Sequence, residues 1–202
     1  MKISELFRSI QGEGRNQGCI SVFVRLAGCN LDCTWCDTRY AREEGADMAP
    51  EEVAAQVGRL GGRRVCITGG EPLLQADELL LLLDRLRADR YIVEIETNGT
   101  LDFRPFREYA AICMDVKCPS SGETSDTSLL AYLTARDCVK FVVGGHADLE
   151  YARSLIGCVP TGPEILVTPV EGSDLAEIAG YILAHNLPVR LQVQLHKIIG
   201  VK

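Results

Sequence analysis

Three cysteines within eight residues are the part of this sequence best suited to chemistry. The spacing of Cys29, Cys33 and Cys36 lets three thiolates hold three corners of an iron–sulfur cube. A structural zinc or ferredoxin site takes its fourth ligand from close by in the chain, but no cysteine or histidine stands between Cys36 and Cys66. The spacing therefore favours a cluster in which the fourth iron keeps an open coordination position.

The remaining cysteines leave two other interpretations to weigh. They are Cys19, Cys66, Cys113, Cys118, Cys138 and Cys158. One of them could complete a zinc tetrahedron with the triplet, since two residues between thiols is a common zinc half-site. Disulfides are less favoured, because the nine cysteines are an odd number, most of the remaining ones lie in apolar runs, and the chain opens on no apolar signal segment. We therefore expect a reducing, cytoplasmic location.

Length and charge narrow the class of protein. The chain has 202 residues and no linker rich in Pro, Gly or Ser, so we expect a single domain over residues 1–202. A net charge of −7 argues against a nucleic-acid partner, which needs clustered Lys and Arg. No apolar run approaches the roughly 18 residues of a membrane span. These features together predict a small-molecule substrate, with no nucleic acid and no membrane as partner.

The apolar periodicity alternates between short β-rich runs and amphipathic stretches, which is typical of βα units around a parallel sheet. Strands are predicted at Ser21–Leu26, Arg64–Thr68, Tyr91–Glu96, Ala111–Val116, Val139–Val143, Glu164–Val167 and Val189–Gln194. Helices are predicted at Pro50–Leu60, Leu79–Leu86, Ser128–Ala135, Asp148–Ile156 and from Ser173 or Asp174 to about His185. These elements are too few for a closed eight-stranded barrel. We expect an α/β fold, namely a partial (β/α)6-type barrel with an open parallel sheet and outer helices.

Unusual segments follow the predicted strands, at the end of the sheet where such folds bind ligands. The cysteine triplet follows the strand that ends at Leu26. The other segments are Gly69-Gly70-Glu71-Pro72, Thr97–Thr100, Lys117–Ser120 and Thr168–Glu171. Because the carboxyl ends of parallel strands meet at one edge of a sheet, we expect all of these segments to surround the opening of one binding cavity.

The cysteine triplet, with Trp35 before its last cysteine and a Gly-Gly-Glu-Pro segment after the next strand, resembles the radical S-adenosylmethionine (SAM) enzymes. The resemblance implies one [4Fe–4S] cluster whose open iron binds SAM, and cleavage of SAM to a 5′-deoxyadenosyl radical. Paired glycines let a backbone approach a ligand closely, and Glu71 can accept from the amino group of SAM. By resemblance the SAM-binding set is Trp35, Asp37, Gly69, Gly70, Glu71, Gly99, Lys117, Cys118, Pro119, Ser120, Thr168 and Pro169.

Further segments narrow the resemblance to one family. Ser9–Gly14, Phe23–Cys29, Trp35–Thr38 and the terminal His196-Lys197 together resemble the 7-carboxy-7-deazaguanine synthases. The resemblance implies a lyase that contracts the ring of 6-carboxy-5,6,7,8-tetrahydropterin with loss of ammonia and reuses SAM. The product enters the 7-deazapurine pathway that feeds queuosine and archaeosine. The resemblance also implies Mg²⁺ and an external electron donor of the flavodoxin or ferredoxin type. Sheet edges left by the short crossover at Cys118–Ser128 favour a homodimer.

The same resemblance assigns the remaining site residues. Thr38 is implied as the single protein ligand to Mg²⁺, with Asp37 as its rival on charge alone. Arg25 lies inside a predicted strand, where a guanidinium needs an anionic partner, either the substrate carboxylate or one of the acids Glu13 and Glu96. Family members commonly end in a proline whose carboxylate reaches the substrate, and Lys202 holds that place here. The implied substrate contacts are Ile10, Gln11, Gly12, Glu13, Arg25, Thr97, His196 and Lys202.

Two alternative functions remain open from the sequence. A glycyl-radical-enzyme activase shares the cysteine triplet and the Gly-Gly-Glu-Pro segment, but it acts on a protein and does not need Gln11-Gly12-Glu13, Arg25 and His196 together. The other alternative is a non-catalytic zinc or iron–sulfur module, in which Cys66, Cys113 or Cys118 completes the triplet.

Overall fold

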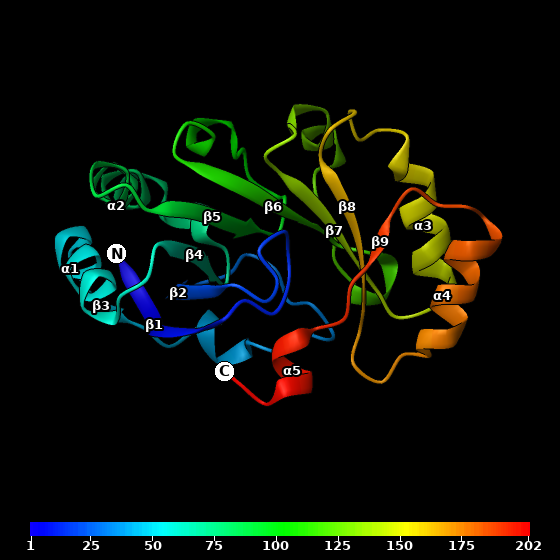
Figure 1. The fold of residues 1–202 in the computed structure, drawn as a ribbon, viewed down its shortest axis with the longest axis horizontal. Coiled ribbons are helices and arrows are strands. Elements are labelled where there is room, and N and C mark those ends of the chain that lie inside the picture. The colour runs from blue at the N-terminus through cyan, green and yellow to red at the C-terminus, as the bar shows by residue number, and fades with distance from the viewer.

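One nine-stranded sheet runs through residues 1–202, all of which the computed structural model describes (Figure 1). The strand order is β3-β1-β2-β4-β5-β6-β7-β8-β9. Neighbouring strands from β2 to β9 pair in parallel, whereas β1 pairs antiparallel with β2 and β3. The strands are β1 (Lys2–Ile10), β2 (Ile20–Leu26), β3 (Ala46–Asp47), β4 (Arg64–Gly69), β5 (Ile92–Thr97), β6 (Ala110–Val116), β7 (Cys138–Val143), β8 (Glu164–Pro169) and β9 (Arg190–Leu191).

The sheet bends into an arch with helices on its outer side (Figure 1). The outer helices are α1 (Pro50–Leu60), α2 (Ala76–Ala88), α3 (His146–Ile156) and α4 (Leu175–Ala184). The short helix α5 (Leu195–Ile199) lies beneath the open side of the arch. This arrangement confirms the predicted open, partial barrel with outer helices.

The apolar core lies between the sheet and the outer helices. Helix α2 contributes Leu79, Leu82, Leu83 and Leu86, which recur at helical spacing and are fully buried in the same core cluster as the strand residues. Helix α1 begins at Pro50, and the Glu52 carboxylate accepts from the backbone N–H of Ala49 at 3.0 Å, as at many helix starts. These contacts fix the outer layer on the sheet. None of the helices has the length and apolar character that crossing a membrane requires.

The other face of the strands carries polar side chains towards the open side of the arch. Arg25 of β2 is in register with Thr68 of β4, and Asp115 of β6 is in register with Lys140 of β7. Glu96 of β5 lies between these two pairs in the strand order. Side chains alternate between the two faces of a strand, so one face of the parallel strands packs in the core, while the other carries these polar residues, together with Phe23, Cys113 and Val142, inside the arch.

The structure corrects several element predictions. The helix predicted over Ser128–Ala135 is a 3-10 helix at Thr127–Tyr132, because Asp137 accepts from the N–H and the hydroxyl of Thr134 at 2.8 and 2.7 Å and turns the chain away. The last predicted strand, Val189–Gln194, shortens to β9. Strands β1 and β3 and helix α5 were not predicted. Strand β1 places Glu5 opposite Arg25.

Candidate active site

A cavity of about 690 Å³ opens under the arch, at the carboxyl ends of the parallel strands. All of the predicted substrate contacts, the three clustered cysteines and Thr38 line this cavity. The predicted residues on its wall are Ile10, Gln11, Gly12, Glu13, Arg25, Cys29, Cys33, Trp35, Cys36, Asp37, Thr38, Gly69, Gly70, Thr97, Lys117, His196 and Lys202. The sequence therefore predicted the main walls of this cavity.

The three cysteines of the loop after β2 are free thiols, with Cys33 buried and the other two half-buried. Thiolates are the ligands of iron–sulfur clusters, and three of them can hold three irons of a [4Fe–4S] cluster. The donor set therefore fits such a cluster.

Gly69 and Gly70 hold the cysteine loop by close backbone packing. A Cβ on Gly69 would lie 2.1 Å from the carbonyl oxygen of Leu26, and a Cβ on Gly70 would lie 1.9 Å from that of Gly28. The N–H of Gly70 donates to Leu26 O at 3.1 Å, and the N–H of Glu71 donates to Gly28 O at 2.8 Å. Any side chain at these positions would push the cysteine loop away from β4. The glycine pair thus approaches protein backbone as well as the cavity.

Glu71 lies behind the cavity wall and is fully buried. Its carboxylate accepts from Asn98 N–H at 2.7 Å, Thr97 Oγ1 at 2.9 Å and Leu73 N–H at 3.0 Å. Burial raises the pKa of Glu71 despite these donors. The sequence suggested that this carboxylate accepts from SAM, whereas the structure commits it to protein donors that join the loops after β4 and β5.

Other residues of the predicted SAM set also lie outside the cavity wall; they are Gly99, Cys118, Pro119, Ser120, Thr168 and Pro169. Gly99 (φ +69°) packs on Met114, where a Cβ would lie 2.5 Å from Cε. Ser120 accepts from Trp35 Nε1 at 3.1 Å, so it supports a residue that does line the cavity. Cys118 is fully buried in the apolar core. These residues lie behind the cavity wall and contact protein there.

Lys117 and Asp115 form a buried ion pair next to the cysteine loop. Lys117 Nζ lies 2.7 Å from Asp115 Oδ2 and 5.3 Å from the centre of the Trp35 ring. Burial alone would lower the pKa of Lys117, but Asp115 and the Cys33 thiol raise it above its usual value. The second oxygen of Asp115, Oδ1, is buried without a hydrogen-bond partner. A ligand in the cavity that carries an N–H or O–H would satisfy it.

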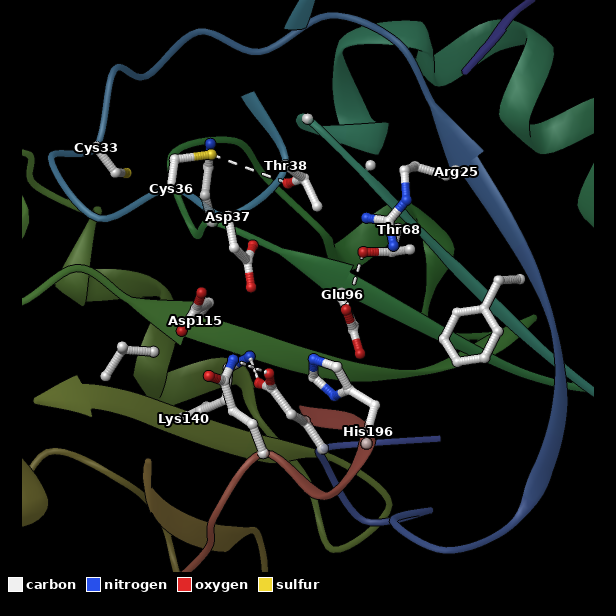
Figure 2. A pocket seen from close by; sticks show the side chains of 18 of the residues that line it. Arg25, Cys33, Cys36, Asp37, Thr38, Thr68, Glu96, Asp115, Lys140 and His196 are labelled. Carbon is white, nitrogen blue, oxygen red and sulfur yellow. Dashed lines mark hydrogen bonds and ion pairs between the residues drawn. The ribbon is translucent and has the colours of Figure 1, made fainter. Parts of the chain in front are cut away.

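The two ends of the chain meet on the opposite wall of the cavity. Gly12 contacts His196 so closely that a Cβ on Gly12 would lie 1.8 Å from Nδ1 of the imidazole. Gln194 Nε2 donates to Glu13 Oε1 at 2.6 Å, and Lys140 pairs with the other oxygen of Glu13. In Figure 2, Lys140 and His196 lie across the cavity from Cys33 and Cys36. Residues nearly two hundred positions apart therefore build one wall.

The ion pair between Glu13 and Lys140 is buried, with 13% and 9% of the side chains exposed. Burial alone would raise the pKa of Glu13, but Lys140, Gln194 and His196 together lower it to about 2. Lys140 also faces Asp115 and Glu96, and its pKa is raised well above the usual value despite burial. Both members of the pair are therefore charged across the physiological pH range.

Arg25 pairs with Glu5 at 3.2 Å rather than with Glu13 or Glu96. The same carboxylate accepts from Tyr40 Oη at 2.9 Å and from Lys202 Nζ at 2.5 Å. The partner was not predicted because β1, which carries Glu5, was not predicted. Arg25 also lies 5.9 Å from the centre of the Phe7 ring, and its side chain remains on the cavity wall.

The cavity has further wall residues that the sequence analysis did not assign. Glu96 accepts from Gln11 Nε2 at 3.1 Å and from Thr68 Oγ1 at 2.9 Å. The unassigned residues include Phe7, Phe23, Tyr40, Thr68, Glu96, Asp115, Lys140, Gln194 and Lys197. Lys140 and Asp115 are charged residues inside apolar strands, as Arg25 is, and this pattern was the signal in the sequence that could have identified them.

Thr38 and Asp37 follow the last cysteine and lie at the cavity wall. The Thr38 hydroxyl lies 3.9 Å from the Cys36 sulfur (Figure 2), and no side-chain oxygen or nitrogen bonds to it. Asp37 is half-exposed and faces Lys197 at 3.6 Å. The hydroxyl is therefore available to a ligand, whereas the carboxylate already has a cationic neighbour.

Comparisons with known proteins show the family of this chain. The radical SAM superfamily model matches residues 23–120. The chain is 52% identical over 200 residues to the 7-carboxy-7-deazaguanine synthase of Methanospirillum hungatei, which covers 99% of this chain and 86% of that protein. It is 38% identical over 218 residues to the synthase of Koribacter versatilis, at 98% and 96% coverage. QueE from Escherichia coli has a similar structure, with a TM-score of 0.77, 28% identity and coverage of 96% of this chain and 94% of that chain. This chain belongs to the 7-carboxy-7-deazaguanine synthase (QueE) family of the radical SAM superfamily.

Proposed function

We propose that this protein is a lyase that converts 6-carboxy-5,6,7,8-tetrahydropterin to 7-carboxy-7-deazaguanine with loss of ammonia. One observation carries the proposal: a single cavity holds the cysteine triplet on one wall and the polar set Gln11, Glu13, Arg25 and His196 on the others. The first wall suits a radical-generating cofactor, and the second suits a small polar heterocycle with a carboxylate. The family relationship supports the same activity.

Cys29, Cys33 and Cys36 would hold the [4Fe–4S] cluster that the radical SAM superfamily implies, and with SAM bound the cluster would supply the radical chemistry for hydrogen abstraction from the substrate. The chain's own residues hold the substrate in place for that step. Arg25 binds the carboxylate of the pterin, since a guanidinium forms paired hydrogen bonds with a carboxylate. Glu5 holds the guanidinium from behind at 3.2 Å, which fixes its direction.

The pyrimidine edge of the pterin offers N–H donors and a carbonyl acceptor. Glu13 and Gln11 supply carboxylate and amide groups at the cavity wall, and His196 and Thr97 supply an imidazole and a hydroxyl. Because the Lys140 partner keeps Glu13 ionised, Glu13 acts as an acceptor for ring N–H groups and not as an acid. Lys202, another of the proposed substrate contacts, also lines the cavity.

Thr38 is the proposed protein ligand to Mg²⁺. A hydroxyl is a hard oxygen donor of the kind that Mg²⁺ accepts, and this ion keeps waters and a substrate oxygen as its other ligands. The Thr38 hydroxyl lines the cavity next to Cys36 and makes no hydrogen bond to oxygen or nitrogen of the chain. Thr38 would hold the ion between the cluster loop and the substrate carboxylate.

The remaining partners are also proposals. An external flavodoxin or ferredoxin would deliver the electron to the cysteine loop, where Arg39 is exposed and offers a cation to an acidic carrier. A homodimer would cover the exposed Leu175 and Leu183 of helix α4, 48% and 79% exposed. A reducing, cytoplasmic compartment suits the nine free thiols.

An anaerobic assay tests the activity. The reconstituted protein is incubated with SAM, a reductant, Mg²⁺ and 6-carboxytetrahydropterin, and product mass and ammonia are followed. The proposal predicts the deazaguanine acid and one ammonia per product. Cleavage of SAM without either product would contradict the substrate assignment, and radical formation on an added glycyl-radical enzyme would favour the activase.

A further inference from the structure

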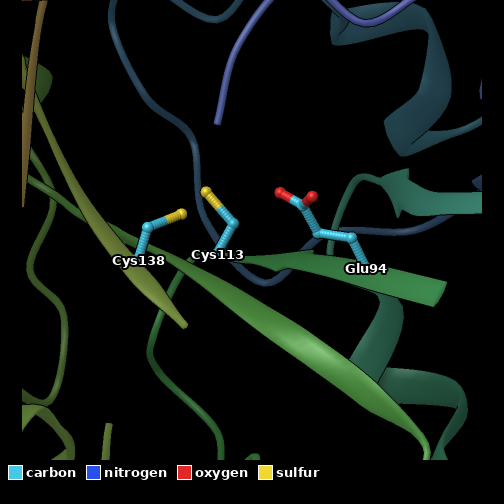
Figure 3. A group of neighbouring side chains, drawn as sticks. All are labelled: Glu94, Cys113 and Cys138. Carbon is cyan, nitrogen blue, oxygen red and sulfur yellow. The ribbon is translucent and has the colours of Figure 1, made fainter. Parts of the chain in front are cut away.

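Three potential metal ligands lie together below the active-site cavity, on neighbouring strands. Glu94 of β5, Cys113 of β6 and Cys138 of β7 project to the same side of the sheet (Figure 3). A carboxylate oxygen of Glu94 and the two sulfurs all lie within 4.8 Å of one another. Cys113 and Cys138 are in register across the β6–β7 pair. All three residues are buried.

The Glu94 carboxylate has one oxygen held by the protein and one without a partner. Asn16 donates its side-chain N–H to Oε2, and Arg64 in turn donates to Asn16 Oδ1 at 2.9 Å. Oε1 is buried without a hydrogen-bond partner, in a residue that is only 4% exposed. Native proteins rarely leave such an acceptor unsatisfied. The outer contacts orient the carboxylate in the way that supporting residues orient ligands at metal sites.

Gly14 packs against the ligand atoms of Glu94 and Cys113. A Cβ at Gly14 would lie 2.7 Å from Glu94 Oε1 and 3.7 Å from Cys113 Sγ. The N–H of Gly14 donates to Gln192 Oε1 at 2.8 Å, and its carbonyl accepts from Gln192 Nε2 at 2.9 Å. Gly14 therefore offers no donor to Oε1, and the absence of a side chain leaves space against the three ligand atoms.

The unpartnered oxygen of Glu94 and the two thiols face one another in a buried place. Burying a polar group without a partner is costly. A divalent ion would supply that partner, because it binds thiolate and carboxylate in their charged forms.

We propose that Glu94, Cys113 and Cys138 form a second metal site, selective for Zn²⁺ and separate from the cluster and the magnesium site. Two thiolates and one carboxylate are a donor set that a borderline-soft ion prefers to Mg²⁺. A water completes the coordination, as at other sites with three protein ligands. Because the ligands come from three adjacent strands, the ion cross-links β5, β6 and β7. Cys113 also lines the cavity. The ion therefore fixes the strands that carry Lys140 and Glu96 on the cavity wall.

The first test measures metals in the holoenzyme. Protein expressed with added zinc and reconstituted anaerobically is analysed for zinc and iron, with four irons per chain showing that the triplet is occupied. The proposal predicts about one zinc per chain. Zinc-edge X-ray absorption should give two sulfurs at about 2.3 Å with oxygen or nitrogen as the other ligands. Zinc below about one-tenth per chain that added Zn²⁺ cannot raise, or a site with three or four sulfurs, would overturn it.

Variants locate the site. Cys138→Ser and Glu94→Gln should each lower zinc content or affinity at least tenfold without changing the iron content. Cys118→Ala is the control, because Cys118 is a buried thiol in the apolar core and lies outside this group, and it should keep its zinc. If Cys138→Ser does not fold, Glu94→Gln decides, since it keeps the size of the side chain. Zinc retained at full content and affinity in Glu94→Gln, or lost in Cys118→Ala, would contradict the assignment.

Discussion

The carboxylate of Glu71 accepts the backbone N–H of Asn98 at 2.7 Å and thereby joins the loop after β4 to the loop after β5. The same residue's own N–H donates to Gly28 in the cysteine loop at 2.8 Å. One buried glutamate thus connects three of the loops that surround the cavity. In the sequence the Gly-Gly-Glu segment resembles a ligand-binding motif. In the structure it also holds the cysteine loop in place.

This role predicts the effect of Glu71→Ala. The substitution leaves the donors of Asn98, Thr97 and Leu73 buried without partners, and the expected loss of unfolding free energy is about 3 kcal/mol or more. Anaerobic denaturant unfolding measures it. Glu51→Gln, at an exposed position of α1, is the control and should change stability by less than about 0.5 kcal/mol. Unchanged stability with a large loss of SAM affinity would instead show a direct contact with SAM.

Thr38→Ala tests the magnesium ligand. Removing the hydroxyl should raise the Mg²⁺ concentration for half-maximal activity about tenfold or more, while iron content and the cluster spectrum stay unchanged. Thr34→Ala is the matched control, because Thr34 lies in the same loop and its hydroxyl donates to the Ser121 carbonyl at 3.1 Å. Loss of the cluster in Thr38→Ala would show that the residue is structural.

Arg25→Gln tests recognition of the substrate carboxylate. Loss of a charge-assisted hydrogen bond should raise KM for the pterin roughly 10- to 100-fold and leave KM for SAM unchanged. Glu5 keeps Lys202 and Tyr40 as partners, so the fold should persist. Arg8→Gln, at an exposed position of β1, should leave both constants unchanged. An equal rise in both KM values would indicate general damage to the cavity.

The pair of Glu13 and Lys140 predicts a pH dependence of stability. The pKa of Glu13 falls from its ordinary 4.5 to about 2 in the folded protein, so folding favours the ionised form. The stabilisation is complete above about pH 4.5 and is lost as the pH falls towards 2; its size is on the order of 3 kcal/mol. Urea unfolding midpoints of wild type and Glu13→Gln should differ most at pH 6, and the difference should shrink below pH 4.5 and vanish only near pH 2. A difference that is constant with pH would refute this.

Much of the fold could be predicted from the sequence, because β2 and β4 to β8 are apolar runs of the length of a buried strand and recur between amphipathic helices. Strand β1 was missed because its apolar residues Ile3, Leu6, Phe7 and Ile10 recur at helical spacing, and a register shift between Ile3 and Glu5 interrupts the alternation typical of a strand. Glu5 was therefore missed as the partner of Arg25. The wall made by Gly12, Gln194 and His196 depends on contacts between the two ends of the chain, which no local pattern encodes.

The predicted site residues line the cavity where a motif projects side chains into it, and they lie behind its wall where the same motif turns inwards. The cysteine triplet and Thr38 lie on the wall as expected. Glu71, Gly99 and Cys118 belong to equally distinctive segments but pack against protein. Whether a loop side chain faces ligand or core depends on three-dimensional packing, and sequence spacing does not fix it.

The most direct test of the proposed function compares product formed with SAM supplied. With the pterin in excess, Mg²⁺ and a reductant, the proposed activity predicts more than one 7-carboxy-7-deazaguanine per SAM, because SAM is reused, and an equal amount of ammonia. Mass spectrometry of product and SAM over time measures the ratio. Accumulation of 5′-deoxyadenosine in step with SAM loss, with no deazaguanine acid formed, would contradict it.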